Sequence, residues 1–318
     1  MNRLIVSIII IILSIASVFV GVVGIELDSI LQGDSHALLI LFVSRLPRLT
    51  AVLITGIALS VAGLIMQQLA RNKYVSPQTG ATIFSAQLGF IIAMVYFNEA
   101  GKKMEIGLAF LFAMIGTTIF MIMVQRTKFK NVIYIPLIGM MLGNVISAVT
   151  EFISYRYNIV QNLKDWSAGN FSLILKGNYE TLYICLPLVI IAFIYANYFN
   201  IAGMGDDFAK NLGVNYKLVL YSGLGIVSLL TAGVVVTVGS IPFVGLIVPN
   251  LVSILKGDRM KMTLIDTALL GAMFLIVCDI VGRLIIFPYE LPIGLTVGVV
   301  GSGIFLLMIW RREVKRAA

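Results

Sequence analysis

The chain has 318 residues, of which 59% are hydrophobic and only 12% are charged, and its mean hydropathy is +1.02. Soluble domains contain roughly 45–50% apolar and about 25% charged residues, so this chain has too few charges to cover a soluble core. The composition excludes soluble, disordered, collagen-like and disulfide-rich classes and indicates a polytopic membrane protein. The net charge of +8 is better explained by Lys and Arg in cytoplasmic loops than by nucleic-acid binding.

Ten apolar segments follow one another along almost the whole chain. A membrane-spanning helix needs about 20 apolar residues, so the sequence predicts an all-α protein with one transmembrane domain over residues 1–318. The first segment is expected to be an uncleaved helix and not a signal peptide. The eighth segment is short and contains Pro249, so we expect a break there. The predicted spans are residues 4–25, 49–69, 78–97, 106–125, 132–153, 181–199, 217–238, 243–255, 263–287 and 291–310.

The distribution of Lys and Arg predicts the orientation of these spans. With the N-terminus inside, 15 of the 23 Lys and Arg residues fall in inner loops and tails, and 8 fall outside. Positive residues accumulate on the cytoplasmic side of a membrane. We therefore expect a multi-pass protein of the cell membrane with both termini in the cytoplasm and a cytoplasmic loop at residues 200–216.

Residue patterns that would indicate catalysis or ion coupling are missing from the sequence. It has no GxxxxGK[ST] loop, so any ATP hydrolysis is expected in a separate chain. No charged residue falls at the centre of a predicted span, which disfavours an ion-coupled carrier. Cys185 and Cys278 lie in apolar runs and His36, the single histidine, lies in a predicted loop. We therefore expect no metal site and no cofactor.

Two arginines stand at the outer mouth of the second span, in the segment Arg45-Leu46-Pro47-Arg48. One explanation is that they extend to lipid phosphates. The other is a rigid cationic pair that binds carboxylates on an external partner. Asp279 and Arg283 lie four residues apart on one helix face. Arg283 therefore either joins this cationic pair or forms a simple intrahelical ion pair.

A second polar cluster, residues 203–213, falls in an inner loop. Asp206 and Asp207 favour the start of a short helix and Gly213 favours its end. Ala209 and Leu212 would give this helix a small apolar face. The cluster is either an ordinary capped loop helix or an element that presses into a groove of another protein.

Small residues recur at intervals of four in two predicted spans. In lipid, such faces allow helices to approach closely, so they indicate either packing within one bundle or a seam between two bundles. The two sets are Gly139, Gly143 and Ser147, and Gly294, Gly298 and Ser302.

Taken together, the polar segments resemble the FecCD family, the permease subunits of ABC importers for iron–siderophores, haem and cobalamin. The resemblance implies ten helices, a dimeric translocation unit, two cytoplasmic ATP-binding subunits and an extracellular or periplasmic siderophore-binding protein. It covers essentially the whole chain. The matching stretches are residues 45–48, 63–67, 71–72, 76–77, 203–213, 239–249, 257–258, 279–283 and 290–294.

The resemblance also implies roles for individual residues. In the family, the corresponding arginines face glutamates of the binding protein, and the inner segment couples the permease to the ATPase. The implied docking residues here are Arg45, Arg48 and Arg283. The implied coupling residues are Gly203, Asp206, Ala209, Leu212 and Gly213.

The sequence departs from the usual family pattern near the inner ends of the spans. Lys73 replaces the proline of Arg-Asn-Pro, and Asn250 replaces the histidine of Val-Pro-His. Ser253 stands where the family has an arginine, and Gly301-Ser302-Gly303 replaces Gly-Ala-Pro. This combination resembles the branch that serves catecholate-type siderophores, including petrobactin, which often pairs two different permease chains.

We therefore predict a permease that imports iron–siderophore complexes and forms a heterodimer rather than a homodimer. A haem or cobalamin permease is the alternative within the family, and an ion-coupled secondary transporter or a membrane scaffold is the alternative outside it. Iron would pass as a chelate along a weakly polar path. Asn144 and Ser147 are candidates for that path.

Overall fold

The computed structural model describes residues 2–21, 28, 32, 34–97, 101–127 and 134–317. In this part of the chain the regular secondary structure is helical. The helices in chain order are α1 (Arg3–Phe19), α3 (Ser35–Ile40), η1 (Leu41–Arg45), α4 (Leu46–Leu69), α5 (Thr82–Tyr96), α6 (Gly101–Arg126), α7 (Tyr134–Arg156), α8 (Val160–Ser167), η3 (Glu180–Ile184), α9 (Cys185–Ala202), α10 (Asp206–Asn211), α11 (Tyr216–Val238), α12 (Val244–Lys256), α13 (Met260–Leu284) and α14 (Ile293–Ala317).

Each of the ten predicted spans overlaps an apolar helix, which confirms the all-α fold. Residues 22–25 of the first predicted span and 132–133 of the fifth lie outside the described residues. In the described residues, six helical segments are long and apolar enough to cross a membrane, and α1, α5, α12 and the first part of α14 are shorter apolar helices. The second span is longer than predicted, because α3, η1 and α4 continue one another over Ser35–Leu69. His36, expected in a loop, is an exposed residue of α3.

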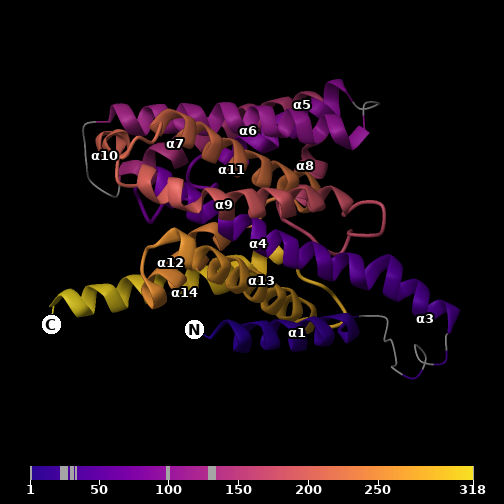
Figure 1. Ribbon diagram of the computed structural model, residues 1–318. Helices are drawn as coiled ribbons and strands as arrows, with labels where there is room; N and C mark the ends of the chain where they lie inside the picture. Colours follow the sequence, from indigo (N-terminus) through magenta and orange to yellow (C-terminus); the bar gives the residue numbers. More distant parts are fainter. Residues whose placement is uncertain are drawn as a thin grey trace.

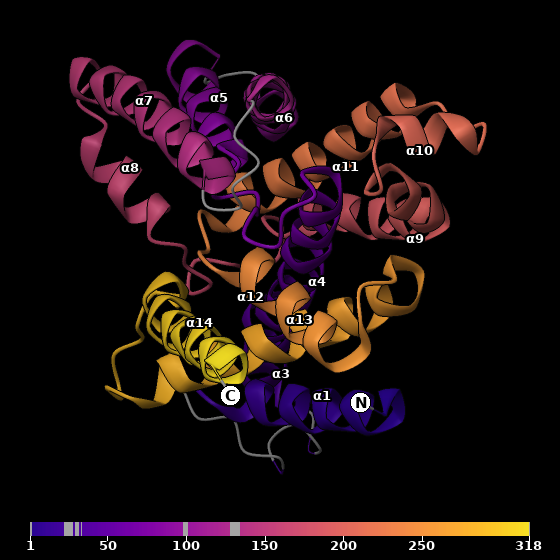
Figure 2. The same ribbon diagram turned by 90° about the vertical axis from the view of Figure 1, so that its left-hand side faces the viewer.

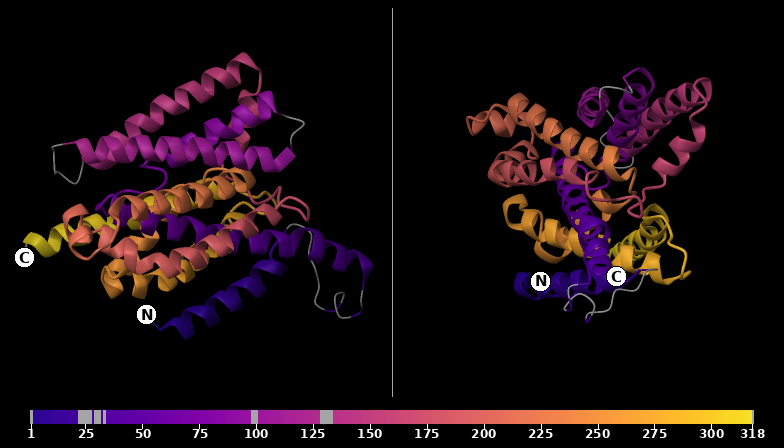
Figure 3. Two further views of the ribbon diagram at one scale, coloured as in Figure 1. Left: turned by 45° about the horizontal axis from the view of Figure 1, so that its top comes forward. Right: turned by 90° about the vertical axis from the view of Figure 1, so that its right-hand side faces the viewer.

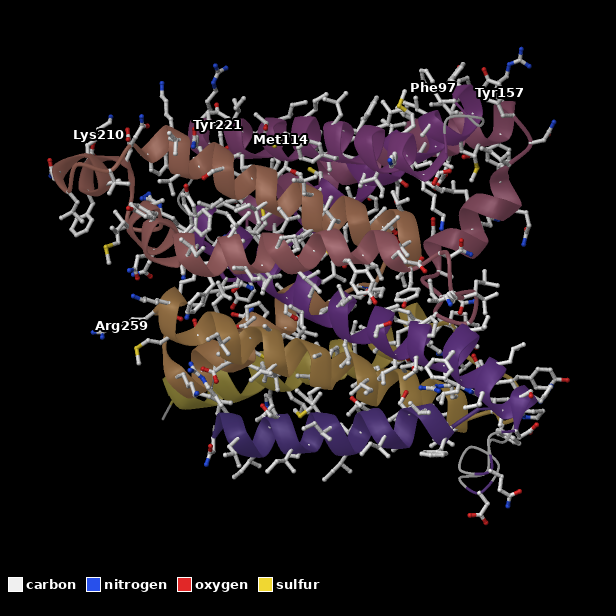
Figure 4. All side chains as sticks on the ribbon, turned by 45° about the vertical axis from the view of Figure 1, so that its right-hand side comes forward. Phe97, Met114, Tyr157, Lys210, Tyr221 and Arg259 are labelled. Atoms are coloured by element: carbon white, nitrogen blue, oxygen red, sulfur yellow. The ribbon has the colours of Figure 1, made fainter. Side chains whose placement is uncertain are left out.

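The start of α1, the end of α14 and helix α10 lie at one end of the bundle, and α3 lies at the other (Figure 1). We call these the inner end and the outer end. The side chains of Lys210 and Arg259 lie at the inner end, whereas Phe97 and Tyr157 lie at the outer end (Figure 4). This arrangement is compatible with the predicted topology, in which the inner end faces the cytoplasm.

Helix α4 runs through the centre of the bundle (Figure 2) and packs against α1, α9, α11, α12 and α13. Small residues allow two of these contacts to be very close. A Cβ atom on Gly56 would lie 2.5 Å from the carbonyl oxygen of Gly271 on α13, and one on Gly63 would overlap the carbonyl of Gly245 on α12. Close backbone approach at small residues is how helices associate in lipid, where apolar burial gives no driving force.

The helices α5, α6 and α7 form a group on the side of α4 opposite α1 (Figure 3). The small face of α7 serves packing inside this group, because Gly139 lies against the carbonyl of Thr79 and Gly143 lies against the ring of Phe84. The face of α14 differs along its length. An added Cβ atom on Gly294 would meet the carbonyl of Ala168, but one on Gly298 would meet no atom within 4 Å.

Two of the short helices, α5 and α12, start after irregular segments that meet inside the bundle. Their N-cap residues, Ala81 and Phe243, both have a positive φ, of 61° and 65°. The backbone N–H of Phe243 donates to Oε1 of Gln78 at 3.4 Å. Non-helical backbone is tolerated at membrane depth only where protein satisfies its polar groups.

The expected break at Pro249 is wrong, because α12 continues through this residue to Lys256. Proline removes one helical hydrogen bond, to the carbonyl four residues earlier, which here belongs to Gly245. This carbonyl lies against Gly63 of α4. The interruption falls instead before α12, at residues 239–243.

Candidate functional sites

The three predicted docking arginines come together at the outer end of the bundle. Arg45 closes the π-helical turn η1, Arg48 lies in the first turn of α4, and Arg283 lies in the last turn of α13. Proline is tolerated in the first turn of a helix, so Pro47 does not interrupt this segment. The three arginines are only 8%, 7% and 3% exposed. All three are therefore buried, whereas contact with lipid phosphates or with a partner's carboxylates, the two explanations offered from the sequence, would need accessible guanidiniums.

Arg48 and Arg283 share one buried carboxylate. Nη2 of Arg48 lies 2.8 Å from Oδ1 of Asp279, and Arg283 pairs with the other oxygen of Asp279 along the same helix. The intrahelical ion pair considered from the sequence is thus present. Arg48 in addition lies 2.6 Å from Oε2 of Glu290, in the connection between α13 and α14. Three arginines and two acidic residues leave this outer arginine cluster with a positive balance.

Two of the three arginines, Arg45 and Arg283, hold the outer end of α1. Nη1 of Arg283 donates to the carbonyls of Ser17 at 2.9 Å and Val20 at 2.7 Å, and Nη1 of Arg45 donates to Val20 at 3.0 Å. Basic side chains commonly satisfy the last carbonyls of a helix in this way. The Arg45 guanidinium lies so close to Gly21 that any Cβ atom there would collide with it. The cluster therefore has a structural task in addition to any docking role.

Glu290 is the member of the cluster that lies nearest to solvent. Its side chain is 18% exposed, whereas that of Asp279 is 2% exposed. Oε2 of Glu290 also accepts a hydrogen bond of 2.6 Å from the hydroxyl of Ser172. Desolvation alone would raise the pKa of Glu290, but hydrogen bonds from Ser172 and Arg48 and the charge of Arg48 lower it below its usual value. Glu290 therefore stays ionised at neutral pH.

The inner cluster forms the short helix α10, and its limits agree with the sequence. Asp206 and Asp207 occupy its first turn, and Gly213 follows with a φ of +72°. Acidic residues at a helix start complement the helix dipole, and glycine adopts a positive φ without steric cost. Lys210 pairs with Asp206 at 2.7 Å, and this hydrogen bond raises the pKa of Lys210.

The apolar face of α10 differs from the prediction. Ala209 is fully buried and points toward the rest of the chain, so it does not share an outward face with Leu212. The exposed apolar residues of this loop are Met204, Phe208 and Leu212. A helix of six residues has too few turns for the sequence to define its buried side. Gly203 packs against Gln68 at the end of α4, with an added Cβ 2.7 Å from its side-chain oxygen.

A cavity of about 410 Å³ lies beside α10 at the inner end. Asp206 and Lys210 line it from α10, and Tyr216 and Lys217 line it from the start of α11. The inner surface around α10 thus combines a hollow lined by charged side chains with exposed apolar side chains.

The two candidate path residues both lie on α7. Asn144 is exposed and Ser147 is half-buried, whereas Gly139 and Gly143 on the same helix are covered by α5 and its preceding segment. The exposed side of α7 is therefore the one away from these two glycines. The assignment of Asn144 and Ser147 to the substrate path stays a prediction.

Metal-ligating side chains are scattered. In the described ranges, no group of three His, Cys, Asp or Glu residues lies close enough to hold a metal ion. Cys185 and Cys278 are free and buried.

The chain is similar to known transport proteins over nearly its full length. Residues 9–311 match the FecCD transport family. The chain is 50% identical over 306 residues to the petrobactin import system permease protein YclN of Bacillus subtilis (strain 168), covering 96% of this chain and 97% of that protein. It is 39% identical to the ferric-anguibactin transport system permease protein FatD of Vibrio anguillarum, covering 92% and 93% of the two chains.

The fold has a counterpart among solved structures. An inward-facing metal-chelate type ABC transporter superposes with a TM-score of 0.82 over 96% of this chain and 97% of that one, at 22% identity. At this identity the likeness concerns the fold. The sequence matches and the shared helical architecture lead to one conclusion: the chain belongs to the FecCD transport family.

Proposed function

We propose that this chain is the permease subunit of an ABC importer that carries iron–siderophore complexes, of the catecholate type, across the cell membrane. The observation that carries the proposal is the 50% identity with a petrobactin import permease over 96% of the chain. The chain itself is a transport subunit and not an enzyme, and the iron crosses as a chelate.

In this proposal, the energy comes from separate cytoplasmic ATP-binding subunits. The sequence has no phosphate-binding loop of the Walker type, so hydrolysis needs another chain. Helix α10 would transmit the movement of the ATPase, with Met204, Phe208 and Leu212 as the exposed apolar contacts. Ala209 would pack α10 against the rest of the chain, and Gly213 would allow the turn that follows it.

At the outer end, the arginine cluster would receive an external substrate-binding protein that carries acidic residues. Arg45, Arg48 and Arg283 provide the positive balance of this surface, and charge complementarity raises the rate at which such partners associate. Because the arginines are buried, a carboxylate of the docking partner would have to approach them between Glu290 and the outer end of α1.

A second permease chain would complete the path. A siderophore chelate is wide, and the core around α4 is filled by close helix contacts. A seam between two bundles offers a passage without opening either core. We favour a different permease chain over a second copy of this one as the partner.

The test is uptake of radioactive iron by a strain that lacks this gene and carries it back on a plasmid. Iron should be offered as catecholate, hydroxamate and citrate chelates, as haem, and as ⁵⁷Co-cobalamin. Gene-dependent uptake of catecholate chelates is the expected result. Uptake of haem or cobalamin alone, or uptake that persists when every candidate partner ATPase gene is deleted, would contradict the proposal.

A further inference from the structure

The outer arginine cluster already contains a carboxylate in the place where a docking partner would put one. We propose that Glu290 acts as an internal substitute for the partner's carboxylate: it occupies Arg48 while the protein is undocked, and docking displaces it. This inference rests on the proposed docking function of the cluster. The partner it describes is a protein surface with acidic residues next to apolar ones.

The two carboxylates on Arg48 lie at different depths. Asp279 is almost fully buried and also binds Arg283, so it is a permanent counter-ion for both arginines. Glu290 lies nearer to solvent and binds Arg48 through Nη1. An incoming carboxylate therefore meets Glu290 before it can reach Arg48, and it can replace Glu290 without disturbing Asp279.

Glu290 can leave without unfolding a helix. It lies in the connection between Leu284 and Ile293, outside both α13 and α14. The hydrogen bonds described for its carboxylate come from Arg48 and from Ser172, and both reach Oε2. Ser172 is itself exposed and lies in the connection between α8 and η3. Releasing Glu290 breaks its partly buried pair with Arg48 and its exposed hydrogen bond with Ser172, while the pair between Arg48 and Asp279 can remain.

The residues just before Glu290 form an exposed apolar rim. Phe287 and Tyr289 are exposed, as is Ile286. Aromatic residues are enriched in protein interfaces, and here they stand directly beside the paired charges. A partner that places a carboxylate on Arg48 would cover this rim at the same time, which would offset part of the cost of displacing Glu290.

Competition of this kind sets the apparent affinity. If only a fraction of the molecules has Arg48 uncovered, the apparent dissociation constant rises by the inverse of that fraction. A contact that is closed about nine times in ten would weaken docking about tenfold. Removing the charge of Glu290 should therefore tighten docking, whereas damage to the site would weaken it.

The experiment measures docking to the complete permease–ATPase complex in lipid nanodiscs. The probe is the fluorophore-labelled external binding protein encoded with the transporter. The test variant is Glu290→Gln. Its matched control is Glu180→Gln, which removes the same charge at the outer end but from a residue that binds the backbone N–H of Gly177. Ser172→Ala loosens Glu290 without changing any charge.

We expect Glu290→Gln to lower the dissociation constant about five- to tenfold, Ser172→Ala to lower it two- to threefold, and Glu180→Gln to leave it within a factor of two. Unchanged or weaker docking of Glu290→Gln, in a variant that melts as the parent protein does, overturns the inference. If Glu290→Gln does not assemble, Ser172→Ala decides alone, and an unchanged dissociation constant there overturns it.

A parallel arm separates this inference from the docking function. Arg48→Glu should abolish docking if the cluster is the docking site. If Arg48→Glu and the parent protein bind the probe equally well, the docking function itself fails. If Arg48→Glu melts as the parent protein does but loses binding, and Glu290→Gln gains none, the docking function stands and only the role of Glu290 is refuted.

Discussion

The guanidinium of Arg48 on α4 lies 2.8 Å from the carboxylate of Asp279 on α13, although the two residues are 231 positions apart in the chain. Asp279 also binds Arg283, one turn further along α13. A single buried carboxylate thus links the central helix to α13 and offsets two buried guanidiniums. Removal of one partner from a buried ion pair typically costs about 3–5 kcal/mol, because the remaining charge is left uncompensated.

We therefore expect Asp279→Asn to lower the free energy of unfolding by about 3–5 kcal/mol. Unfolding can be followed by tryptophan fluorescence in mixed micelles as the SDS fraction rises. Asp207→Asn at the exposed start of α10 is the control, and a surface carboxylate of this kind should change stability by less than about 1 kcal/mol. Equal stability of the two variants would mean that Glu290 alone balances the arginines.

Docking of the external binding protein should depend on Arg45 and on ionic strength. Arg45→Glu replaces attraction by repulsion toward an acidic partner, so the association rate should fall about tenfold in low salt. The loss should shrink at 1 M salt, where the Debye length is about 3 Å. Arg156→Glu, an exposed outer arginine on α7, makes the same charge change outside the cluster. A comparable loss in both variants would show a general charge effect and not a docking site.

The sequence predicts the spans well, because a helix in lipid must be apolar over about 20 residues. It does not predict which helix α4 would contact, since close contacts such as Gly63 with Gly245 depend on residues far apart in the chain. Patterning also favoured a break at Pro249. In the structure α12 nevertheless continues through Pro249, and the carbonyl of Gly245, which proline leaves without a helical partner, lies against Gly63 of α4.

The docking arginines illustrate the limit of local patterns. Their position at an outer mouth follows from the spans, but their burial follows from Asp279, Glu290 and the carbonyls of α1, which no spacing connects to Arg45. Arginines on the outer side are unusual in a chain whose positive charges lie mostly inside. This was the one feature of the sequence that indicated nearby carboxylates. Glu290 was visible as part of a family segment but had no predicted role.

Helix α10 gives a prediction that distinguishes its two faces. Phe208 is exposed, so Phe208→Asp should leave the fold intact but uncouple ATP hydrolysis from iron uptake, with uptake reduced about tenfold. Ala209 is fully buried, so Ala209→Arg should instead lower expression and thermal stability, because a long charged chain has no space there. Uptake and ATPase activity of the same reconstituted complexes are the measurements. Normal uptake by Phe208→Asp would place the ATPase contact elsewhere.

At the inner end, a positive charge that the family pattern places on α12 comes here from Lys73, in the turn after α4. Nζ of Lys73, after α4, lies 2.9 Å from the hydroxyl of Ser253 on α12 and 2.8 Å from Asp258 in the following turn. The family has a proline at the position of Lys73 and an arginine at that of Ser253. The positive charge beside Asp258 therefore comes from Lys73 and not from residue 253 of α12.

This relationship predicts a rescue. Lys73→Met should reduce siderophore–iron uptake about threefold with little change in stability, since an exposed pair is worth about 0.2–1 kcal/mol. Adding Ser253→Arg to Lys73→Met should restore uptake, because the cation returns to the same carboxylate from α12. Lys73→Met with Ser253→Ala is the control and should stay impaired. If the arginine variant is as impaired as this control, the charge beside Asp258 is not what Lys73 contributes to transport.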